Sequence, residues 1–472
     1  MELQGAGYFL FLGLVVLVRS VLAPRWRIPL LLGASMAFYA MSSVPYLFMF
    51  LALSVFNYLA ALNLSRENGG PYRTAVFGAI LALDLLVLIT FKYLSRHIQP
   101  WLEAIGLHDY ASFKAVAPLG ISYFTFQMVA CVTDAYRRDW KLSPGLIRFL
   151  LFGLYFPQIT SGPIPRAGRL LPQLTGDVEP TTDDQLMGLR LIAYGLFKKY
   201  VVANRLGPYV TQIFAVPPEH SALHYSTLPA LLGCIFNALN LYADFSSYVD
   251  IALGSASLMG VRLDPNFNQP FISTSVTEFW RRWHMTLSFW LRDYLYMPLL
   301  IRIRDLGMLG VILALIFTFA VCGVWHDATW TYLFFGVAQG LAMSMELLTK
   351  RWRNRRLKMV PAGGLAAAGW FYTMSFFVLS EVLFRASSLS NAGMVFSSLF
   401  HFQLFSSAAE LFAYKGPFDF VLAFVAVAVW FAVANGVRRV SMASTPIFVF
   451  ACALLILFLG RMGTGQFIYA GF

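Results

Sequence analysis

The chain has 472 residues, of which 58% are hydrophobic and only 12% are charged, and its formal net charge is +12. A soluble protein of this length needs more polar side chains than these to cover its surface, so the composition excludes a soluble globular protein and predicts an integral membrane protein. The apolar runs are about 20 residues long, the length at which a helix crosses a bilayer, so we expect an all-α, polytopic membrane protein.

The basic residues lie mainly in short loops between the apolar runs. This distribution is typical of cytoplasmic loops, and it favours that origin of the positive charge over binding to nucleic acid. A second interpretation is attraction to anionic membrane lipid or to a phosphate-bearing donor. The four cysteines have neither disulfide nor metal-site spacing, and they lie apart at Cys131, Cys234, Cys322 and Cys452.

Five apolar runs in the first 136 residues predict membrane spans. The first run ends in Arg19 without a small-residue cleavage site, so we expect no cleavable signal peptide. Taken in order, the runs cover residues 8–22, 28–43, 46–63, 75–93 and 116–136.

The pattern of spans is interrupted between Leu150 and Leu174, where prolines and glycines are too frequent for a straight helix. Irregular backbone at membrane depth is tolerated only inside protein or beside a cavity, so we expect a re-entrant or cavity-lining segment. The amphipathic stretch from Leu186 to Asn204 predicts a helix at the membrane interface. Its cationic side chains are Arg190, Lys198 and Lys199.

Ionisable side chains occur in two further places before the centre of the chain. His220 and His224 are four residues apart in an exposed loop, but no third ligand accompanies them, so we expect solvated histidines and no metal site. The apolar run from Leu228 to Gly260 contains Asp244 and Asp250. Carboxylates at that depth are costly, so we expect each to bond to a tyrosine, a serine or a basic partner inside the bundle.

The second half continues with five apolar runs and a strongly basic cluster at residues 350–358, which predicts a cytoplasmic loop. With the earlier runs they make about eleven transmembrane helices plus re-entrant and interfacial helices, in a single membrane domain over residues 1–472. The five runs cover residues 309–324, 332–348, 362–383, 418–434 and 446–460.

The most polar stretch of the second half covers residues 271–298. Ser275 and Glu278 have the spacing of a capping box, so a helix is predicted to begin there. On a 3.6-residue period this helix has an aromatic face and a cationic face, the latter suited to headgroups, carboxylates or the phosphates of a donor. The aromatic face comprises Trp280, Trp283, His284, Leu287 and Leu291, and the cationic face comprises Arg281, Arg282, Ser288 and Arg292.

A second histidine, His326, ends an apolar run between Trp325 and Asp327. An ionisable side chain there is costly, and burial favours the neutral imidazole, which can accept a proton from a hydroxyl group. The alternative interpretation is structural. In that case His326 caps a helix end or bonds a carbonyl, and His284 only packs among tryptophans.

Several motifs closely resemble the membrane-bound O-acyltransferase (MBOAT) family. The nearest branch looks like the bacterial alginate O-acetyltransferase and cellulose-acetylation membrane subunits, with the teichoic acid D-alanyl transferase more distant. The resemblance covers most of the chain and implies an MBOAT-type helical fold. Its motifs are NFNQPFISTSVTEFWRRWHMTLSFWLRDYLYMP, GVWHDATW, PLGISYFTFQ, FPQITSGPIPR, YADFSSYVDIALG, VLFRASSL and the terminal FIY.

The resemblance also implies roles for single residues. The catalytic histidine of the family's WHG-type motif falls on His326, and the FWRRWH histidine falls on His284, which is expected to line the same chamber. The NFN asparagine falls on Asn266, which is implied as a polar support. The remaining predicted substrate-binding or supporting residues are Trp325, Asp327, Trp283, Arg281, Arg282, Gln339 and Asp244.

The chain departs from the family pattern at three places. Asp327 replaces the usual glycine, and Gln339 stands where the alginate branch commonly has a second histidine. The sequence LLIRIRD replaces the expected glycine-rich turn after the LRDYLY motif. A mechanism that needs two imidazoles in addition to His284 lacks one of them, because Gln339 is not a histidine. The altered loop affects which acceptor the family resemblance implies.

The expected function is that of an O-acetyltransferase in a bacterial inner (cytoplasmic) membrane, serving the modification of an exopolysaccharide such as cellulose or alginate. The resemblance implies acetyl-CoA as a cytoplasmic donor substrate, no bound cofactor, and a periplasmic acetyl-accepting partner protein. D-alanylation of teichoic acid is the alternative reaction. A transporter and a scaffold of a polysaccharide export complex are alternatives without chemistry, although no paired interrupted helices favour transport.

Overall fold

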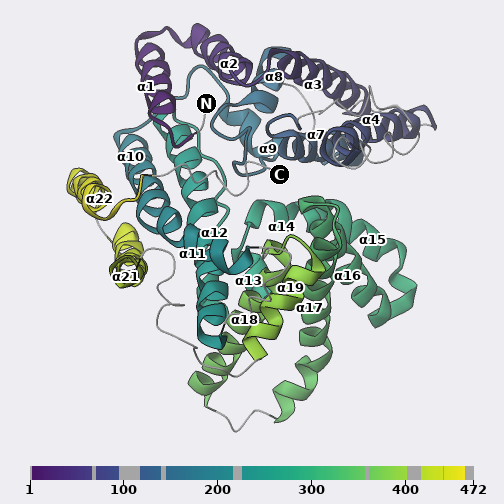
Figure 1. Cartoon of the computed structure of the whole chain (residues 1–472). Helices are drawn as coiled ribbons and strands as arrows, with labels where there is room; N and C mark the ends of the chain where they lie inside the picture. Colours follow the sequence, from purple (N-terminus) through teal and green to yellow (C-terminus); the bar gives the residue numbers. More distant parts are fainter. Residues whose placement is uncertain are drawn as a thin grey trace, which may run out of the picture. The chain divides into compact units, whose positions relative to one another are not determined.

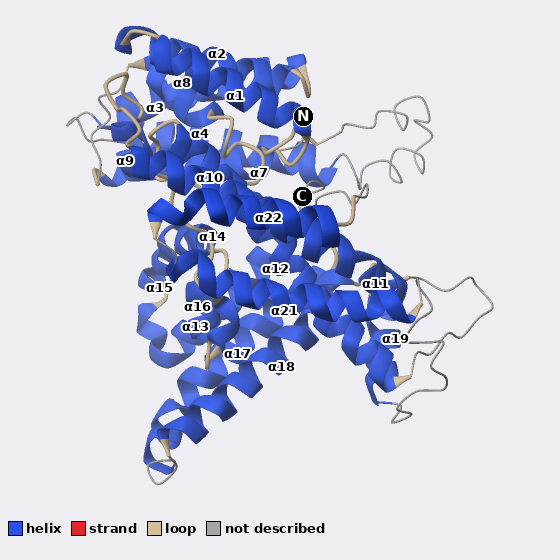
Figure 2. Ribbon diagram, turned by 90° about the vertical axis from the view of Figure 1, so that its left-hand side faces the viewer, coloured by secondary structure: helices blue, strands red, loops and turns tan. Residues whose placement is uncertain are grey.

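The computed structural model of the chain describes residues 3–65, 71–94, 117–139, 145–215, 226–356, 361–400, 416–439 and 441–462. All regular structure in these ranges is helical (Figure 2). The expected all-α fold is therefore confirmed. The histidines His220 and His224 and the terminal FIY motif lie outside the described residues.

The described residues form two compact units (Figure 1). Unit 1 contains the residues up to Ala193 and Tyr248–Pro265, and unit 2 contains Tyr194–Ser247 and the residues from Asn266 onward. The prediction of a single membrane domain stays a prediction.

Unit 1 is built from helices in the first part of the chain. Within it α3 packs against α4, α7 and α8, and α2 packs against α8. The bounds are α1 (Ala6–Val21), α2 (Pro24–Ala40), α3 (Val44–Ser65), α4 (Pro71–Ile89), α7 (Ile121–Arg137), α8 (Leu146–Leu154) and α9 (Ala167–Leu170).

Unit 2 contains the later helices, and two helices contribute residues to both units. The two are α10 (Thr182–Phe197) and α12 (Thr227–Leu258). The helices of unit 2 are α11 (Asn204–Phe214), α13 (Val276–Arg282), α14 (Met285–Leu291), α15 (Met297–Arg302), α16 (Gly307–His326), α17 (Trp330–Arg356), α18 (Ala362–Arg385), α19 (Leu389–Phe400), α21 (Pro417–Arg439) and α22 (Thr445–Leu459).

Eight helices among the described residues are long and apolar enough to cross a membrane, which supports a multi-pass membrane protein. The sequence predicts about eleven, and the three runs that account for the difference became α1, α2 and α7. The helix α1 is apolar but short. Pro29 lies inside α2, and α7 is 17 residues long with nearly every side chain buried, polar ones such as Gln127 included. Helices that mix polar side chains into a buried surface do not meet the hydropathy of a lipid-facing span.

The interruption after Leu150 is confirmed as irregular backbone inside the protein. The helix α8 ends at Leu154, and the residues from Tyr155 to Pro165 are all buried. The main chain then turns into the single-turn helix α9. This segment lies where polar main-chain groups must be satisfied within the protein.

The predicted interfacial helix is wrong in its environment. Arg190, Lys198 and Lys199 are 2%, 2% and 5% exposed, so they do not form a solvated or headgroup-facing surface. The helix changes at Lys198 into a π-helix that runs to Ala203. The two lysines are buried because α12 supplies their partners, which local periodicity does not reveal.

The helices α16 and α17 form a hairpin in which they run side by side (Figure 1). Glycines permit this approach. A Cβ atom on Gly323 would overlap the carbonyl oxygen of Tyr332, and one on Gly336 would overlap the carbonyl oxygen of Phe319. Small residues that let two backbones approach closely are typical of helix pairs in membranes. The hairpin carries His326 at the end of its first helix.

Candidate active site

The helix predicted from Ser275 begins as expected but does not run to residue 292. Ser275 is the N-cap, and its side chain accepts a hydrogen bond from the main-chain N–H of Glu278. The helix α13 ends at Arg282, and α14 begins at Met285. The prediction of one continuous helix with two faces is therefore wrong.

The break places His284 in an unusual backbone conformation. Its φ and ψ angles are 42° and 53°, in the left-handed region that glycine and asparagine adopt most easily. The carbonyl of His284 accepts a hydrogen bond from Ser288 N at 2.9 Å, so the residue starts α14. A left-handed residue between two short helices turns the chain sharply, and the imidazole lies at this turn.

Asn266, in the segment of main chain beside this turn, holds the turn in place. Its carbonyl accepts a hydrogen bond from Met285 N at 2.8 Å, and its Oδ1 accepts hydrogen bonds from Thr286 N at 3.2 Å and Thr286 Oγ1 at 2.5 Å. Asn268 N donates to the carbonyl of Arg282 at 2.9 Å on the other side of the turn. Asn266 is fully buried, and its Nδ2 has no hydrogen-bond partner among the described residues.

The imidazole of His284 is buried beside an aromatic ring. It is 1% exposed, and its ring centroid lies 4.8 Å from that of Phe245 in an edge-to-face contact. Burial lowers the pKa of His284 to about 3, because a charged imidazolium would lose its hydration. His284 is therefore neutral at physiological pH.

His326 is the last residue of α16 and is 5% exposed. Its ring centroid lies 4.5 Å from that of Trp325 and 4.8 Å from that of Phe384 on α18, and it stacks on Tyr332 at 6.1 Å. Three elements thus enclose the ring. The next residue, Asp327, turns the chain and accepts a hydrogen bond from Ala328 N at 3.0 Å.

Gln339 connects three helices rather than lining an open space. Its Oε1 accepts a hydrogen bond from Trp280 Nε1 on α13 at 3.1 Å, and its Nε2 donates to Ser380 Oγ on α18 at 2.9 Å. The side chain is 2% exposed. The amide of Gln339 thus satisfies a buried tryptophan and a buried serine at once.

The two arginines of α13 have different surroundings. Arg281 is exposed, whereas Arg282 pairs with Glu278 at 2.8 Å and donates to the carbonyl of Asn268 at 3.2 Å. Trp283 is buried against the rings of Phe279, Phe267, Tyr242 and Phe377. Arg282 and Trp283 therefore stabilise the turn at His284.

Asp244 has the basic partner that its depth in an apolar helix predicts. Its Oδ1 lies 2.7 Å from Lys199 Nζ, and both side chains are buried. Lys198 donates to Ser246 Oγ at 2.7 Å and lies over the ring of Tyr194. Two lysines of one π-helix thus meet polar groups of α12.

The sequence analysis did not single out two buried carboxyl groups of unit 2, those of Glu346 and Glu381. Glu346 on α17 accepts the main-chain N–H groups of Val276 and Thr277, at 2.5 and 3.0 Å, and so anchors the start of α13. Glu381 on α18 is 2% exposed, and its Oε2 has no hydrogen-bond partner among the described residues. An ionisable residue inside an apolar run was the available signal for both.

Within the described residues, no group of three or more His, Cys, Asp or Glu side chains is arranged to hold a metal ion. The described contacts of unit 2 bring Asn266 and His284 together at one turn. They also bring His326 to the end of the α16–α17 hairpin, which Gln339 ties to α13 and α18.

Comparison with known proteins identifies a family. The model of the membrane-bound O-acyltransferase family matches residues 122–388. The chain is 32% identical over 404 residues to "Probable alginate O-acetylase AlgI" of Azotobacter vinelandii, covering 84% of this chain and 77% of that protein. It is 30% identical over 411 residues to "Peptidoglycan O-acetyltransferase" of Helicobacter pylori, covering 81% and 75%.

A further relative is named for a different activity. The chain is 31% identical over 303 residues to "Teichoic acid D-alanyltransferase" of Bacillus subtilis, covering 63% of this chain and 72% of that protein. Asn266, His284, His326 and Gln339 all lie inside the segment that the family model matches. The chain is an enzyme of the acyltransferase class and belongs to the membrane-bound O-acyltransferase family.

Proposed function

We propose that the protein is an O-acetyltransferase of a bacterial inner membrane that serves the acetylation of an exopolysaccharide. Acetyl-CoA is the donor from the cytoplasm, and the final acceptor is a hydroxyl group of the polymer, reached directly or through a periplasmic acetyl-accepting protein. The names of two relatives, an alginate O-acetylase and a peptidoglycan O-acetyltransferase, support acetyl transfer.

His326 is the general base of the proposed reaction. As the acceptor oxygen attacks the thioester carbonyl carbon, its proton passes to a neutral imidazole nitrogen. The tetrahedral intermediate then collapses, the carbon–sulfur bond breaks, and the imidazolium returns the proton to the departing thiolate. The products are the O-acetyl ester and the free thiol, so atoms and charges balance.

The observation that carries this proposal is the position of His326. An imidazole at the end of a long apolar helix, 5% exposed and enclosed by Trp325 and Phe384, is shielded from bulk water. Shielding protects a thioester and its tetrahedral intermediate from hydrolysis.

Asn266 is the proposed polar support. Its Oδ1 is engaged by Thr286, whereas its buried Nδ2 has no hydrogen-bond partner among the described residues. An amide N–H held in place by the opposite end of the same side chain is a donor that needs no reorganisation when an oxyanion forms. His284, neutral and buried at the same turn, is the second proposed polar group of the chamber.

The decisive test replaces His326 by alanine in the full chain. We expect loss of acetyl transfer from acetyl-CoA by the purified protein in proteoliposomes and loss of polymer acetylation in cells, with unchanged expression. The matched control is Trp330→Ala, because Trp330 is close in sequence but 67% exposed. Normal transfer by a stably inserted His326→Ala protein would refute the assignment.

The same assay separates the other functions. A transporter or a scaffold would leave the thioester of acetyl-CoA intact in every variant. D-alanyl transfer is the second candidate reaction because a teichoic acid D-alanyltransferase is a relative, although that match covers 63% of the chain against 84% for the alginate O-acetylase. A D-alanyl thioester offered in place of acetyl-CoA distinguishes the two reactions.

A further inference from the structure

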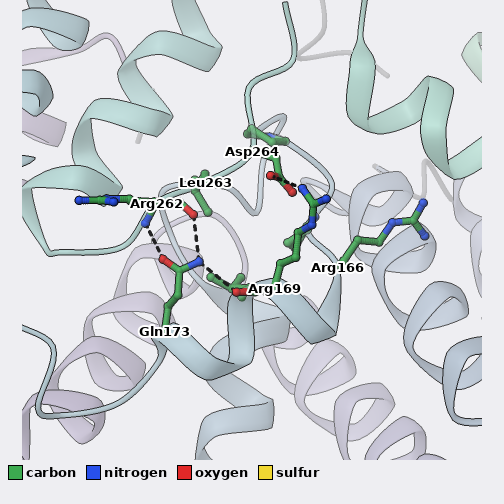
Figure 3. A pocket seen from close by; sticks show the side chains of 9 residues that line it. Arg166, Arg169, Gln173, Arg262, Leu263 and Asp264 are labelled. Atoms are coloured by element: carbon green, nitrogen blue, oxygen red, sulfur yellow. Dashed lines mark hydrogen bonds and ion pairs between the residues drawn. The ribbon is translucent and has the colours of Figure 1, made fainter. Parts of the chain in front are cut away.

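A cavity of about 230 Å³ lies within unit 1, and none of the residues that the proposed reaction uses is in its lining (Figure 3). Two segments far apart in the chain line it, the irregular segment that leads through α9 and the loop that follows α12. Its lining residues are Pro163, Pro165, Arg166, Arg169, Leu170, Gln173, Arg262, Leu263 and Asp264.

The amide of Gln173 joins the two sides of the cavity. Its Oε1 accepts a hydrogen bond from Arg262 N at 2.9 Å, and its Nε2 donates to the carbonyls of Arg262 at 3.1 Å and Arg169 at 3.0 Å. Figure 3 shows these bonds around the Gln173 side chain. Pro163 and Pro165 are buried, and the fixed φ angle of proline removes freedom from that wall. The cavity is therefore held open by the fold.

The charge of the lining is positive. Arg169 belongs to α9 and Arg166 is the N-cap of that helix, and their side chains point in different directions (Figure 3). Arg169 Nη1 lies 2.7 Å from Asp264 Oδ1. The guanidinium of Arg262 points away from Gln173 and Arg169 (Figure 3) and pairs with Asp184, outside the lining, at 2.9 Å. Three arginines therefore line the cavity, whereas Asp264 is the one carboxylate in its lining.

The ion pair between Arg169 and Asp264 contributes too little to stability to explain why an arginine stands at this position. The Arg169 side chain is 72% exposed, and exposed ion pairs contribute little. A guanidinium has five N–H donors in a planar fork, and the pair with Asp264 occupies one of its nitrogens.

We propose that this cavity, lined by three arginines, binds the phosphate group of a ligand, with Arg169 as the main anion-binding side chain. Planar bidentate recognition of phosphate is the chemistry in which arginine excels. The cavity is smaller than the roughly 300–1,000 Å³ that encloses a drug-sized ligand, so it takes the phosphate-bearing end of a molecule and not the whole. The two sources of such a group are a soluble phosphate ester and the headgroup of an anionic phospholipid.

This inference concerns unit 1 alone and does not depend on acyl transfer. The test compares the purified full-length protein with Arg169→Gln and Asp264→Asn. The matched control is Arg304→Gln, which removes the same charge from an arginine that is also exposed and also beside an aspartate, Asp305. Circular dichroism and size-exclusion chromatography check the fold of each variant, and Arg169→Lys replaces Arg169→Gln if the latter does not fold.

The first arm measures the affinity of pyrophosphate and of coenzyme A by calorimetry. The second arm counts bound phosphatidylglycerol and phosphatidylcholine by native mass spectrometry. Arg169→Gln should weaken binding about tenfold or more in one arm, whichever holds the true source, while Arg304→Gln leaves it unchanged. Asp264→Asn should strengthen the same binding because it removes the competing carboxylate. Equal binding by the wild type and Arg169→Gln in both arms, or weaker binding by Asp264→Asn, would overturn the proposal.

Discussion

Lys199 Nζ and Asp244 Oδ1 lie 2.7 Å apart in unit 2, and the two side chains are 6% and 2% exposed. The lysine belongs to a π-helix and the aspartate to α12, 45 residues further along the chain. A buried charge is tolerated at this position because the oppositely charged side chain lies within ion-pair distance. The pair therefore fixes the position of the π-helix against α12.

Removing either member alone should destabilise the protein strongly. Lys199→Met leaves a buried carboxylate without its cation, and Asp244→Asn leaves a buried ammonium without its anion. Each is expected to lower the free energy of unfolding by about 3–5 kcal/mol, whereas the double variant should lose less than the sum of the two. The measurement is unfolding by SDS in mixed micelles.

The exposed pair Arg304 and Asp305, 3.8 Å apart, is the control for this cycle. The corresponding Arg304→Met and Asp305→Asn changes should cost less than about 1 kcal/mol. Additive losses at Lys199 and Asp244 would contradict the assignment of a coupled buried pair.

Gly323 and Gly336 should tolerate no larger side chain. The Cβ of Gly323→Ala would overlap the carbonyl of Tyr332 and lie 3.1 Å from the nitrogen of Gly336, so α16 and α17 must separate. We expect a loss of about 1–3 kcal/mol in the free energy of unfolding, together with reduced activity because His326 ends the same helix.

The matched change is Gly33→Ala in α2, where a Cβ meets nothing within 4 Å. It should be neutral or stabilise the protein by up to about 1 kcal/mol through helix propensity. A Gly323→Ala protein as stable as the Gly33→Ala protein would show that the two helices can separate without cost.

Acid should destabilise the protein through His284. Burial lowers its pKa to about 3 in the folded protein, against about 6.5 in the unfolded chain. Below pH 6.5 the unfolded chain therefore takes up a proton that the folded protein refuses, and stability falls as pH falls towards 3. Between pH 6.5 and pH 5 this effect amounts to about 1.5 kcal/mol.

The variant His284→Asn isolates this contribution, since asparagine accepts the left-handed backbone but does not titrate. Thermal unfolding of both proteins across this pH range measures the difference. Parallel pH profiles for the wild type and His284→Asn would mean that the buried imidazole does not resist protonation.

Gln339→Leu should destabilise the junction of α13, α17 and α18. The change leaves the Trp280 indole N–H without its acceptor and Ser380 Oγ without its donor in a buried place, at a cost of about 1–3 kcal/mol. Ser380→Ala removes only one of the two bonds and should cost less. Thermal unfolding in detergent gives the order, and an order reversed between the two variants would refute the bridging role of Gln339.

Several features followed from local sequence. The length and hydropathy of the apolar runs predicted the helical membrane fold, and Ser275 with Glu278 predicted the correct start of α13. The prolines after Leu150 predicted irregular backbone inside the protein. The depth of Asp244 predicted a partner of the type that Lys199 supplies. Each of these depends on neighbours in the chain or on the cost of burial alone.

Other features depend on contacts between distant segments, and local periodicity could not reveal them. The end of α13 at Arg282 is fixed by Asn266 and Asn268, which bond to the backbone on both sides of His284. The burial of Lys198 and Lys199 depends on α12. Family resemblance marked Asn266 and His284 as important residues without predicting that one holds the turn at the other.

The backbone conformation at residue 284 is strained for any residue that carries a side chain. Glycine would adopt a φ of 42° without strain, whereas a side chain at this angle costs about 1–2 kcal/mol. Glycine would therefore fit this bend with less strain than the histidine that the protein has there. A ring kept at a strained and fully enclosed position fits the role that we propose for His284 in acyl transfer, and His284→Gly should relieve the backbone strain, leave a cavity beside Phe245 and lower acyl transfer.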